Sequence, residues 1–305
     1  MKRDLISMDD LSAQDIREYL ELAKRVESLP PGKQGSRLMG RILMVMFFEP
    51  STRTRLSFES AMCRLGGSVI GFSESMITSV AKGESVVDTI HTVENYADII
   101  VIRHPKEGTA RLASEISYLP VVNAGDGTNQ HPSQTLLDLY TIQKFFGKIN
   151  GLRIAFVGDL KYSRTVHSLI QALLKFPRQD FLLVSPETLK LPEYLKQEDD
   201  ETAKFTETEE IEDALSTCDL IYMTRIQKER FPDLLEYEKV KDSYCIDTSM
   251  LENAAESLRI LHPLPRVNEI SYSVDRTTYA GYFQQVRNGL IMRQAILLKL
   301  LGESI

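Results

Sequence analysis

Hydrophobic residues repeat at two spacings along the chain. A helical spacing of three and four occurs near both ends, at Ile16, Leu20, Ala23 and Val26 and at Leu290, Ile291, Ile296, Leu297 and Leu300. Between the ends, short apolar runs alternate with helix-like stretches. We interpret these runs as strands over 42–48, 68–72, 98–102, 120–122, 153–157, 181–184, 219–223, 244–246 and 259–261.

Apolar runs of this kind are expected to be buried on both faces. Their alternation with helices is typical of a parallel sheet covered by helices. The pattern restarts after Gly147–Gly151, which indicates a domain boundary. The sequence therefore predicts an α/β protein with two domains of similar size, a cleft between them, and ligands bound outside the carboxyl ends of the strands.

The composition is that of a soluble enzyme. Of the 305 residues, 43% are hydrophobic and 26% are charged, and the net charge is −7. This balance argues against a nucleic-acid-binding protein that works through bulk positive charge. The acidity is local, because residues 198–213 hold nine acids against Lys204 alone and leave the rest of the chain at +1. We interpret this acidic segment as a solvated face or loop.

The sequence offers no membrane span. Its longest apolar run, Ile42–Phe48, has seven residues, whereas a membrane-spanning helix needs roughly 20. No apolar segment follows the positive pair Lys2-Arg3, as a secretory signal would require. We therefore expect a cytoplasmic protein that does not act at a membrane.

Three cysteines, Cys63, Cys218 and Cys245, lie far apart in apolar contexts. We expect buried free thiols rather than disulfides or metal ligands. The sequence contains no C-x-x-C motif, no H-E-x-x-H motif and no carboxylate-rich calcium loop. We therefore predict no metal and no other cofactor.

The first predicted strand leads into the segment Ser51-Thr52-Arg53-Thr54-Arg55, after which a helix begins. Hydroxyl groups, guanidinium groups and unpaired N–H groups at a helix N-terminus form a dense set of donors for an anion. Two arginines in a first turn oppose the preference of the helix dipole. Together these features predict a phosphate site rather than an ordinary N-cap.

The same segment resembles the carbamoyl phosphate signature of the carbamoyltransferase family. Further segments resemble that family in the expected order: Arg103-His104-Pro105, His131-Pro132-Ser133-Gln134, the stretch 158–167, the stretch 224–230, and His262-Pro263-Leu264-Pro265-Arg266. The likeness covers most of the chain. It implies two α/β domains whose N- and C-terminal helices pack together, with residues 1–148 and 286–305 binding carbamoyl phosphate and residues 149–285 binding the acceptor.

Within the family the chain resembles the aspartate carbamoyltransferases. Ornithine carbamoyltransferases typically carry a His-Cys-Leu-Pro loop, whereas this chain reads His262-Pro263-Leu264-Pro265. Basic residues also occupy two strand-end loops of the second domain, where ornithine would require acids. Two arginines can grip two carboxylates in bidentate fashion. The resemblance implies transfer of a carbamoyl group from carbamoyl phosphate to L-aspartate, giving N-carbamoyl-L-aspartate and phosphate, an early step of de novo pyrimidine biosynthesis.

The resemblance also implies a role for each matching residue. Thr54, Arg103 and His131 would be catalytic, by donating hydrogen bonds to the carbonyl oxygen as it gains negative charge. Carbamoyl phosphate would be bound by Ser51, Thr52, Arg53, Thr54, Arg103, His131, Gln134, Ser79 and Lys82. Aspartate would be bound by Lys82, Arg164, Arg225, Gln227, Pro263 and Leu264. Glu49 would belong with Arg164 and Arg230 to an interdomain set of ion pairs, in which the carboxylate of Glu49 pairs with the arginines as a loop closes over the substrates.

In this family Ser79 and Lys82 would reach the active site of a neighbouring subunit, so the resemblance implies a homotrimer. A separate zinc-containing regulatory chain can join such trimers, and the sequence leaves its presence open. Two alternatives to the main interpretation also stay open: a carbamoyltransferase for ornithine or another amine, and a non-catalytic phosphate- or nucleotide-binding module. The turn at Gly158-Asp159 lacks the G-x-G-x-x-G pattern and so gives dinucleotide binding little support.

Overall fold

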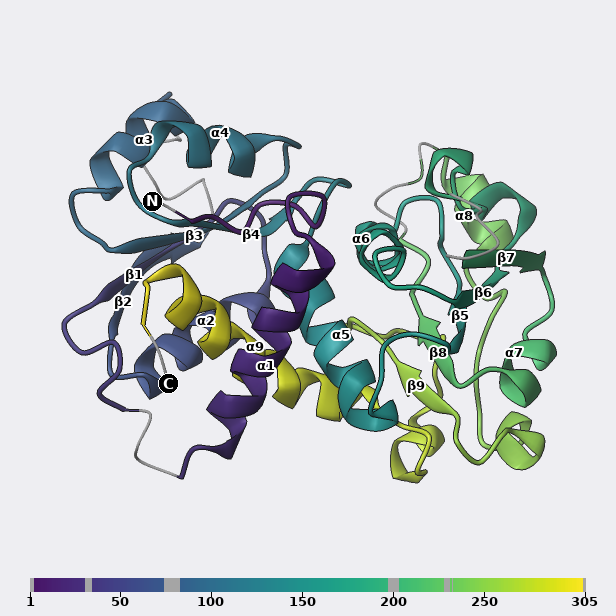
Figure 1. Cartoon of the computed structure of the whole chain (residues 1–305). Helices are drawn as coiled ribbons and strands as arrows, with labels where there is room; N and C mark the ends of the chain where they lie inside the picture. Colours follow the sequence, from purple (N-terminus) through teal and green to yellow (C-terminus); the bar gives the residue numbers. More distant parts are fainter. Residues whose placement is uncertain are drawn as a thin grey trace. The chain divides into compact units, whose positions relative to one another are not determined.

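The computed structural model describes residues 3–30, 35–73, 83–196, 203–227, 231 and 233–303. It divides into two compact units, Met1–Tyr140 with Arg287–Ile305 and Thr141–Val286. Each unit holds one parallel sheet flanked by helices (Figure 1), which confirms the predicted α/β fold class. The chain passes from one unit to the other within two helices, α5 (Pro132–Phe146) and α9 (Tyr282–Leu300).

The sheet of unit 1 has the strand order β2-β1-β3-β4, and all its pairs are parallel. Its strands are β1 (Ile42–Phe47), β2 (Ser68–Ser73), β3 (Ile99–His104) and β4 (Val121–Asp126). The helices of this unit, besides its shares of α5 and α9, are α1 (Ala13–Ser28), α2 (Thr52–Arg64), α3 (Val86–Val93) and α4 (Thr109–Ile116).

Alternate residues of these strands face opposite sides of the sheet, as the two-residue period of a strand requires. One side packs on α3 and α4 through the buried residues Met44, Met46, Ile90, Val93, Ile100, Ile102, Ala110 and Ala113. The helices α1, α2 and α9 cover the other side (Figure 1). Burying one isoleucine, valine or methionine side chain of this layer contributes about 1.5–3 kcal/mol to folding. The continuous apolar runs of the sequence are therefore the central layer of unit 1.

Both predicted terminal helices are confirmed, and they pack together. A capping box starts α1, because the Ser12 side chain accepts from the Asp15 N–H and the Asp15 carboxylate accepts from the Ser12 N–H. Near the end of α9, the Lys299 Nζ lies 2.6 Å from an oxygen of Glu18 and 4.4 Å from the centre of the Tyr19 ring. From Arg287 onward, the C-terminal helix thus belongs to the first unit.

The sheet of unit 2 has the order β7-β6-β5-β8-β9, again with parallel pairs. Its strands are β5 (Arg153–Val157), β6 (Gln179–Val184), β7 (Ala203–Thr208), β8 (Leu220–Met223) and β9 (Arg259–Leu261). Its helices are α6 (Arg164–Leu173), α7 (Glu212–Thr217) and α8 (Leu234–Val240), with short 3-10 turns η3 (Glu187–Leu189), η4 (Glu193–Leu195), η6 (Met250–Asn253) and η7 (Tyr272–Arg276).

The sequence reading missed one strand and predicted one that is absent. β7 lies within the acidic segment, at an edge of the sheet, where charged side chains can stay exposed while the backbone pairs on one side only. The predicted strand 244–246 is not formed: Ile246 makes a single isolated bridge with Ile270. The apolar pattern of β7 is weak, since Ala203 is its one buried residue. In 244–246, Tyr244 and Ile246 are buried although the segment forms no strand.

The prediction of buried free thiols is right for Cys218 and wrong for the other two cysteines. All three are free, but Cys63 and Cys245 are exposed. Cys63 lies on α2 at a position that faces away from the sheet, while its neighbour Met62 is buried. Within the described residues, no helix is long and apolar enough to cross a membrane.

Gly158 follows β5 with φ +112°, and a Cβ at this position would lie 2.3 Å from the carbonyl oxygen of Thr224 after β8. We predict that Gly158→Ala destabilises unit 2 by about 3 kcal/mol, because the backbones must separate. Gly147→Ala is the matched control: its φ is +70° but a Cβ would meet nothing within 4 Å. Urea unfolding should show a loss clearly larger for Gly158→Ala, and equal losses would contradict the steric explanation.

Candidate functional site

The strand order of unit 1 reverses beside β1. After β1 the chain adds β2 on one side, and it returns to place β3 on the other side of β1. In open parallel sheets, ligands bind at such a point, outside the carboxyl ends of the strands. The segment 48–51 that follows β1 and the residue pair Arg103-His104 that ends β3 lie there. This edge is our candidate site in unit 1.

The predicted anion-binding segment forms the start of α2. Ser51 is the N-cap and its side chain makes no capping hydrogen bond, and no acidic residue lies in the first turn. The N–H groups of the first turn have no partner within the helix. Thr54 is 6% exposed. Arg55 forms an ion pair at 2.6 Å with Glu59 one turn later, which balances its charge within the helix. The Arg53 side chain is exposed.

Arg103 connects the ends of three strands. One guanidinium nitrogen forms an ion pair with Glu49, which follows β1. Another donates to the Ala124 carbonyl of β4 at 3.1 Å. The side chain is 12% exposed. Because a guanidinium has five N–H donors in a rigid fork, these contacts orient Arg103 without using all its donors.

His131 and Gln134 lie at the start of α5, where every residue from 131 to 140 is buried. The Nδ1 of His131 is 3.4 Å from the Ser133 hydroxyl oxygen. The Nε2 of Gln134 donates to Asp138 Oδ1 at 2.9 Å, one helical turn further on. The two predicted site residues are thus anchored by neighbours on their own helix.

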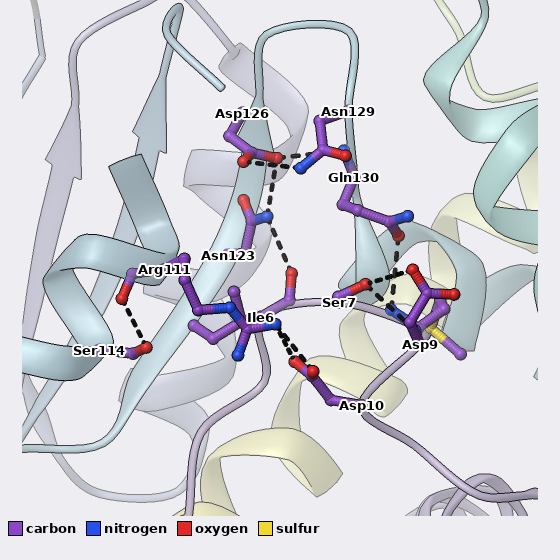
Figure 2. A network of polar contacts seen from close by, with 11 residues as sticks. Ile6, Ser7, Asp9, Asp10, Arg111, Ser114, Asn123, Asp126, Asn129 and Gln130 are labelled. Carbon is purple, nitrogen blue, oxygen red and sulfur yellow. Dashed lines mark hydrogen bonds and ion pairs between the residues drawn. The ribbon is translucent and has the colours of Figure 1, made fainter. Parts of the chain in front are cut away.

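A buried carboxylate, Asp126, holds the loop that leads to His131 (Figure 2). Asp126 is 2% exposed and ends β4. Its Oδ1 accepts from the Gln130 N–H at 3.1 Å and from Asn123 Nδ2 at 2.9 Å. Its Oδ2 accepts from the Gly108 N–H at 3.0 Å and from Asn129 Nδ2 at 3.2 Å. Asp126 therefore ties the loops after β3 and β4 together.

The N-terminal segment completes this network. Asn123 Nδ2 also donates to the Ile6 carbonyl at 3.0 Å, and the Met8 N–H donates to Gln130 Oε1 at 3.4 Å. Figure 2 shows this segment running beside the loop, with Arg111 bound to Asp10 nearer the surface. The segment before α1 thus supports the loop of His131 from outside the sheet.

In unit 2 the strand order reverses between β5 and β8, and the predicted acceptor-binding residues gather at that edge. Asp159 follows β5 and is fully buried. It accepts from the Tyr162 N–H at 2.9 Å and from the backbone of Lys161 and Gln227. Burial raises the pKa of Asp159 to about 6, although these bonds and the nearby charge of Arg225 lower it. Asp159 thereby links the loop before Arg164 to the loop of Arg225 and Gln227.

The loop of Pro263 and Leu264 is organised by His262, which is 1% exposed. Its Nδ1 accepts from the Leu264 N–H at 2.7 Å, and its Nε2 lies 2.6 Å from Glu269 Oε1. An acceptor at Nδ1 requires the proton on Nε2, so the imidazole donates to Glu269. Leu264 has φ +55°, a conformation that costs a non-glycine residue energy. The buried histidine holds Leu264 in that conformation.

Two other histidines have structural roles. His104 is buried beside Phe48, and its Nδ1 accepts from the Lys106 N–H at 3.0 Å. The Nε2 of His167 lies 2.8 Å from the Leu160 carbonyl oxygen. Burial lowers the pKa of both imidazoles, so both are neutral near pH 7.

The structure places the predicted residues in two groups. Glu49, Ser51–Thr54, Arg103, His131 and Gln134 belong to unit 1, and Arg164, Arg225, Gln227, Pro263 and Leu264 belong to unit 2. Ser79, Lys82 and Arg230 lie outside the described residues. Sequence reasoning missed Asp126, Asp138 and Asp159. Of these, only Asp159 lay within a recognised segment, and a lone aspartate near a strand end is a weak signal.

No group of three or more His, Cys, Asp or Glu side chains suited to a metal ion occurs among the residues that the structure describes. The candidate sites of the two units differ in chemistry. Unit 1 offers N–H, hydroxyl and guanidinium donors, as a phosphorylated ligand requires. Unit 2 offers two arginines and a backbone loop, which suit a ligand with carboxylates.

Two family models match the chain, one over most of each unit. Residues 3–144 match the model of the aspartate/ornithine carbamoyltransferase carbamoyl-P binding domain, and residues 150–300 match the Asp/Orn binding domain. The chain belongs to the aspartate/ornithine carbamoyltransferase family. The family assignment accounts for the order of its motifs along the chain.

Similar members of this family include aspartate carbamoyltransferase catalytic subunits. That of Thermococcus onnurineus is 56% identical over 98% of this chain and 97% of its own. The solved catalytic subunit of Methanocaldococcus jannaschii is 53% identical, covering 99% and 98%, with a TM-score of 0.91. The Trypanosoma cruzi aspartate transcarbamoylase, solved with N-(phosphonacetyl)-L-aspartic acid, is 36% identical, covering 97% and 95%, with a TM-score of 0.90.

We predict that Asp126→Ala costs this carbamoyltransferase about 2–4 kcal/mol of folding free energy, because four donors lose a buried acceptor. The control is Asp10→Ala, which removes the exposed ion pair with Arg111 and should cost under about 1 kcal/mol. Urea unfolding measures both variants. Equal losses would show that Asp126 does not hold the loop.

Proposed function

We propose that the chain catalyses transfer of the carbamoyl group from carbamoyl phosphate to the amino group of L-aspartate. The products are N-carbamoyl-L-aspartate and phosphate. The observation that carries the proposal is the convergence of the Ser51–Thr54 segment and Arg103 at the chain reversal of unit 1. The relatives support it, since the solved Trypanosoma cruzi enzyme is described with carbamoyl aspartate and phosphate bound.

In the carbamoyl phosphate half, Ser51, Thr52, Arg53 and Thr54 bind the phosphate through N–H, hydroxyl and guanidinium donors at the start of α2. Thr54, Arg103 and His131 donate to the carbonyl oxygen, and these bonds strengthen as the tetrahedral oxyanion forms. If the Ser133 hydroxyl donates to Nδ1 of His131, the proton lies on Nε2, which can then donate to the substrate. Gln134 receives the carbamoyl amide.

In the aspartate half, Arg164 and Arg225 bind the two carboxylates and Gln227 adds a polar contact. The backbone carbonyls of Pro263 and Leu264 accept from the amino group or from the carbamoyl NH₂. The Leu264 N–H is already bound to His262, so this residue contacts a ligand through its carbonyl. Holding both substrates in a reactive orientation supplies much of the rate.

We assign residues 1–148 with 286–305 to carbamoyl phosphate binding and residues 149–285 to aspartate binding. The reaction would serve an early step of pyrimidine biosynthesis in the cytoplasm. Glu49 is paired with Arg103 in its own unit. We propose that the Glu49 carboxylate also forms ion pairs with Arg164 and Arg230 when the loop after β8 closes on the substrates.

The wild-type chain, offered carbamoyl phosphate with L-aspartate or L-ornithine, should form product with aspartate alone. We predict that His131→Ala lowers kcat roughly 10²- to 10³-fold, because an oxyanion donor is lost. His91→Ala is the control, since His91 is exposed and its Nδ1 lies 3.0 Å from Glu94 on the same side of α3. Turnover with ornithine alone would overturn the aspartate assignment, and equal rates for both variants would remove His131 from the mechanism.

We also propose that the chain works as a homotrimer in which Ser79 and Lys82 complete the active site of a neighbouring subunit. Lys82 would contact both substrates there. The name catalytic subunit, given to the relatives, supports a further partner, a separate zinc-containing regulatory chain. Binding of that chain would be tested with a relative's regulatory subunit by sedimentation.

A mixing experiment tests the shared site. Lys82→Ala trimers, dissociated and reassociated with His131→Ala subunits, should give more activity than either parent, because some hybrid sites receive both intact residues. Mixing His131→Ala with Arg53→Ala is the control, because one subunit supplies both residues to a site and no hybrid site can then receive both intact. A gain in the control alone, or no gain in hybrid trimers, would contradict the shared site.

A further inference from the structure

Gln134 and Asp138 form a buried pair on one face of α5. The Gln134 Nε2 donates to Asp138 Oδ1 at 2.9 Å. Asp138 is fully buried, and Gln134 is 9% exposed. The pair lies one turn apart, as the i, i+4 spacing of a helix places side chains together. Nothing in the proposed reaction requires Asp138 itself to contact a substrate.

The chemistry of Asp138 fixes the orientation of the Gln134 amide. An ionised carboxylate accepts hydrogen bonds and donates none, whereas an amide has a donating NH₂ on one side and an accepting oxygen on the other. Asp138 therefore selects the orientation in which the Gln134 NH₂ faces it. The amide oxygen Oε1 is left on the other side, as an acceptor.

Arg293 of α9 keeps a positive charge beside Asp138. Arg293 is 4% exposed, and its guanidinium lies 5.2 Å from the centre of the Phe58 ring of α2. Burial lowers the pKa of Arg293 to about 10, and the charge of Asp138 opposes that shift. Arg293 is still a cation near pH 7. Gly289 leaves room for it, because a Cβ there would lie 2.7 Å from Arg293 Nη1.

We propose that Asp138 is a positioning residue that makes the site specific for the carbamoyl group. By holding the Gln134 NH₂, it presents Oε1 to the NH₂ of carbamoyl phosphate. An acyl phosphate with a methyl group in place of that NH₂ cannot donate, and leaves the acceptor unpaired. The inference rests on the proposed function, because it explains how Gln134 is oriented to bind the carbamoyl amide.

The test compares two stable ligands that differ only in this group. Phosphonoacetamide carries the NH₂ of carbamoyl phosphate, and acetonylphosphonate carries a methyl group in its place. Calorimetric titration of the full chain gives the ratio of their dissociation constants. Asp138→Asn should reduce the preference for phosphonoacetamide roughly three- to tenfold, because asparagine can present either its oxygen or its NH₂ to Gln134 and so no longer fixes the amide.

A double-mutant cycle separates positioning from a general structural effect. Gln134→Ala should also reduce the preference, and adding Asp138→Asn to Gln134→Ala should change it no further. If Asp138→Asn does not fold, Asp138→Ser provides the same test, since serine is smaller and its hydroxyl both donates and accepts.

Three results would overturn the inference. A folded Asp138 variant with an unchanged preference would show that Asp138 does not orient Gln134. An equal effect of Asp138→Asn with and without Gln134 would assign it a general structural role. Wild-type chain that binds neither ligand would overturn the proposed function and this inference with it, whereas wild-type binding with unchanged variants would leave the proposed function intact.

Discussion

The reversal of strand order beside the first strand of each sheet is the constraint on which the candidate sites of both units depend. In a parallel sheet the carboxyl ends of all strands lie on the same side. Between most neighbouring strands, the connection to a crossover helix covers these ends. The chain leaves β1 to form β2 on one side and later returns to form β3 on the other side. The loops that follow β1 and β3 therefore turn in opposite directions and leave the carboxyl ends of these strands open. The same event occurs between β5 and β8 in unit 2. Polar residues from different loops can meet at these two places without interrupting a buried strand.

Buried carboxylates stabilise the loops at these edges. Asp126 accepts from the loops after β3 and β4, and Asp159 accepts from the loops after β5 and β8. Each is a buried acceptor that satisfies backbone N–H groups which regular structure cannot. Such bonds are charge-assisted and therefore stronger than neutral ones. The strand ends are rigid, and hydrogen bonds to these carboxylates hold the loops that follow them, although the loops contain little regular structure.

The sequence could predict the layers and the motif residues, because both depend on local patterns. The apolar runs gave the strands of both sheets except β7, and the dense donor set of Ser51–Thr54 indicated an anion site. The acidic segment concealed β7, since an edge strand needs no apolar alternation. The exposure of Cys63 depends on which face of α2 meets the sheet, and an apolar neighbourhood in sequence does not determine that face.

The residues that support the site could not be predicted, because their role arises only from contacts between distant segments. Asp126 and Gly108 are 18 residues apart, and Arg293 approaches Asp138 from the far end of the chain. Arg55 shows the reverse case: it belongs to the recognised motif, yet its partner is Glu59 on the same helix. A contact within one helix fixes an arginine relative to that helix alone, whereas contacts with residues of other segments fix it relative to the ends of the strands. Arg103, bound by Glu49 and the Ala124 carbonyl, is therefore the better-oriented donor of the two.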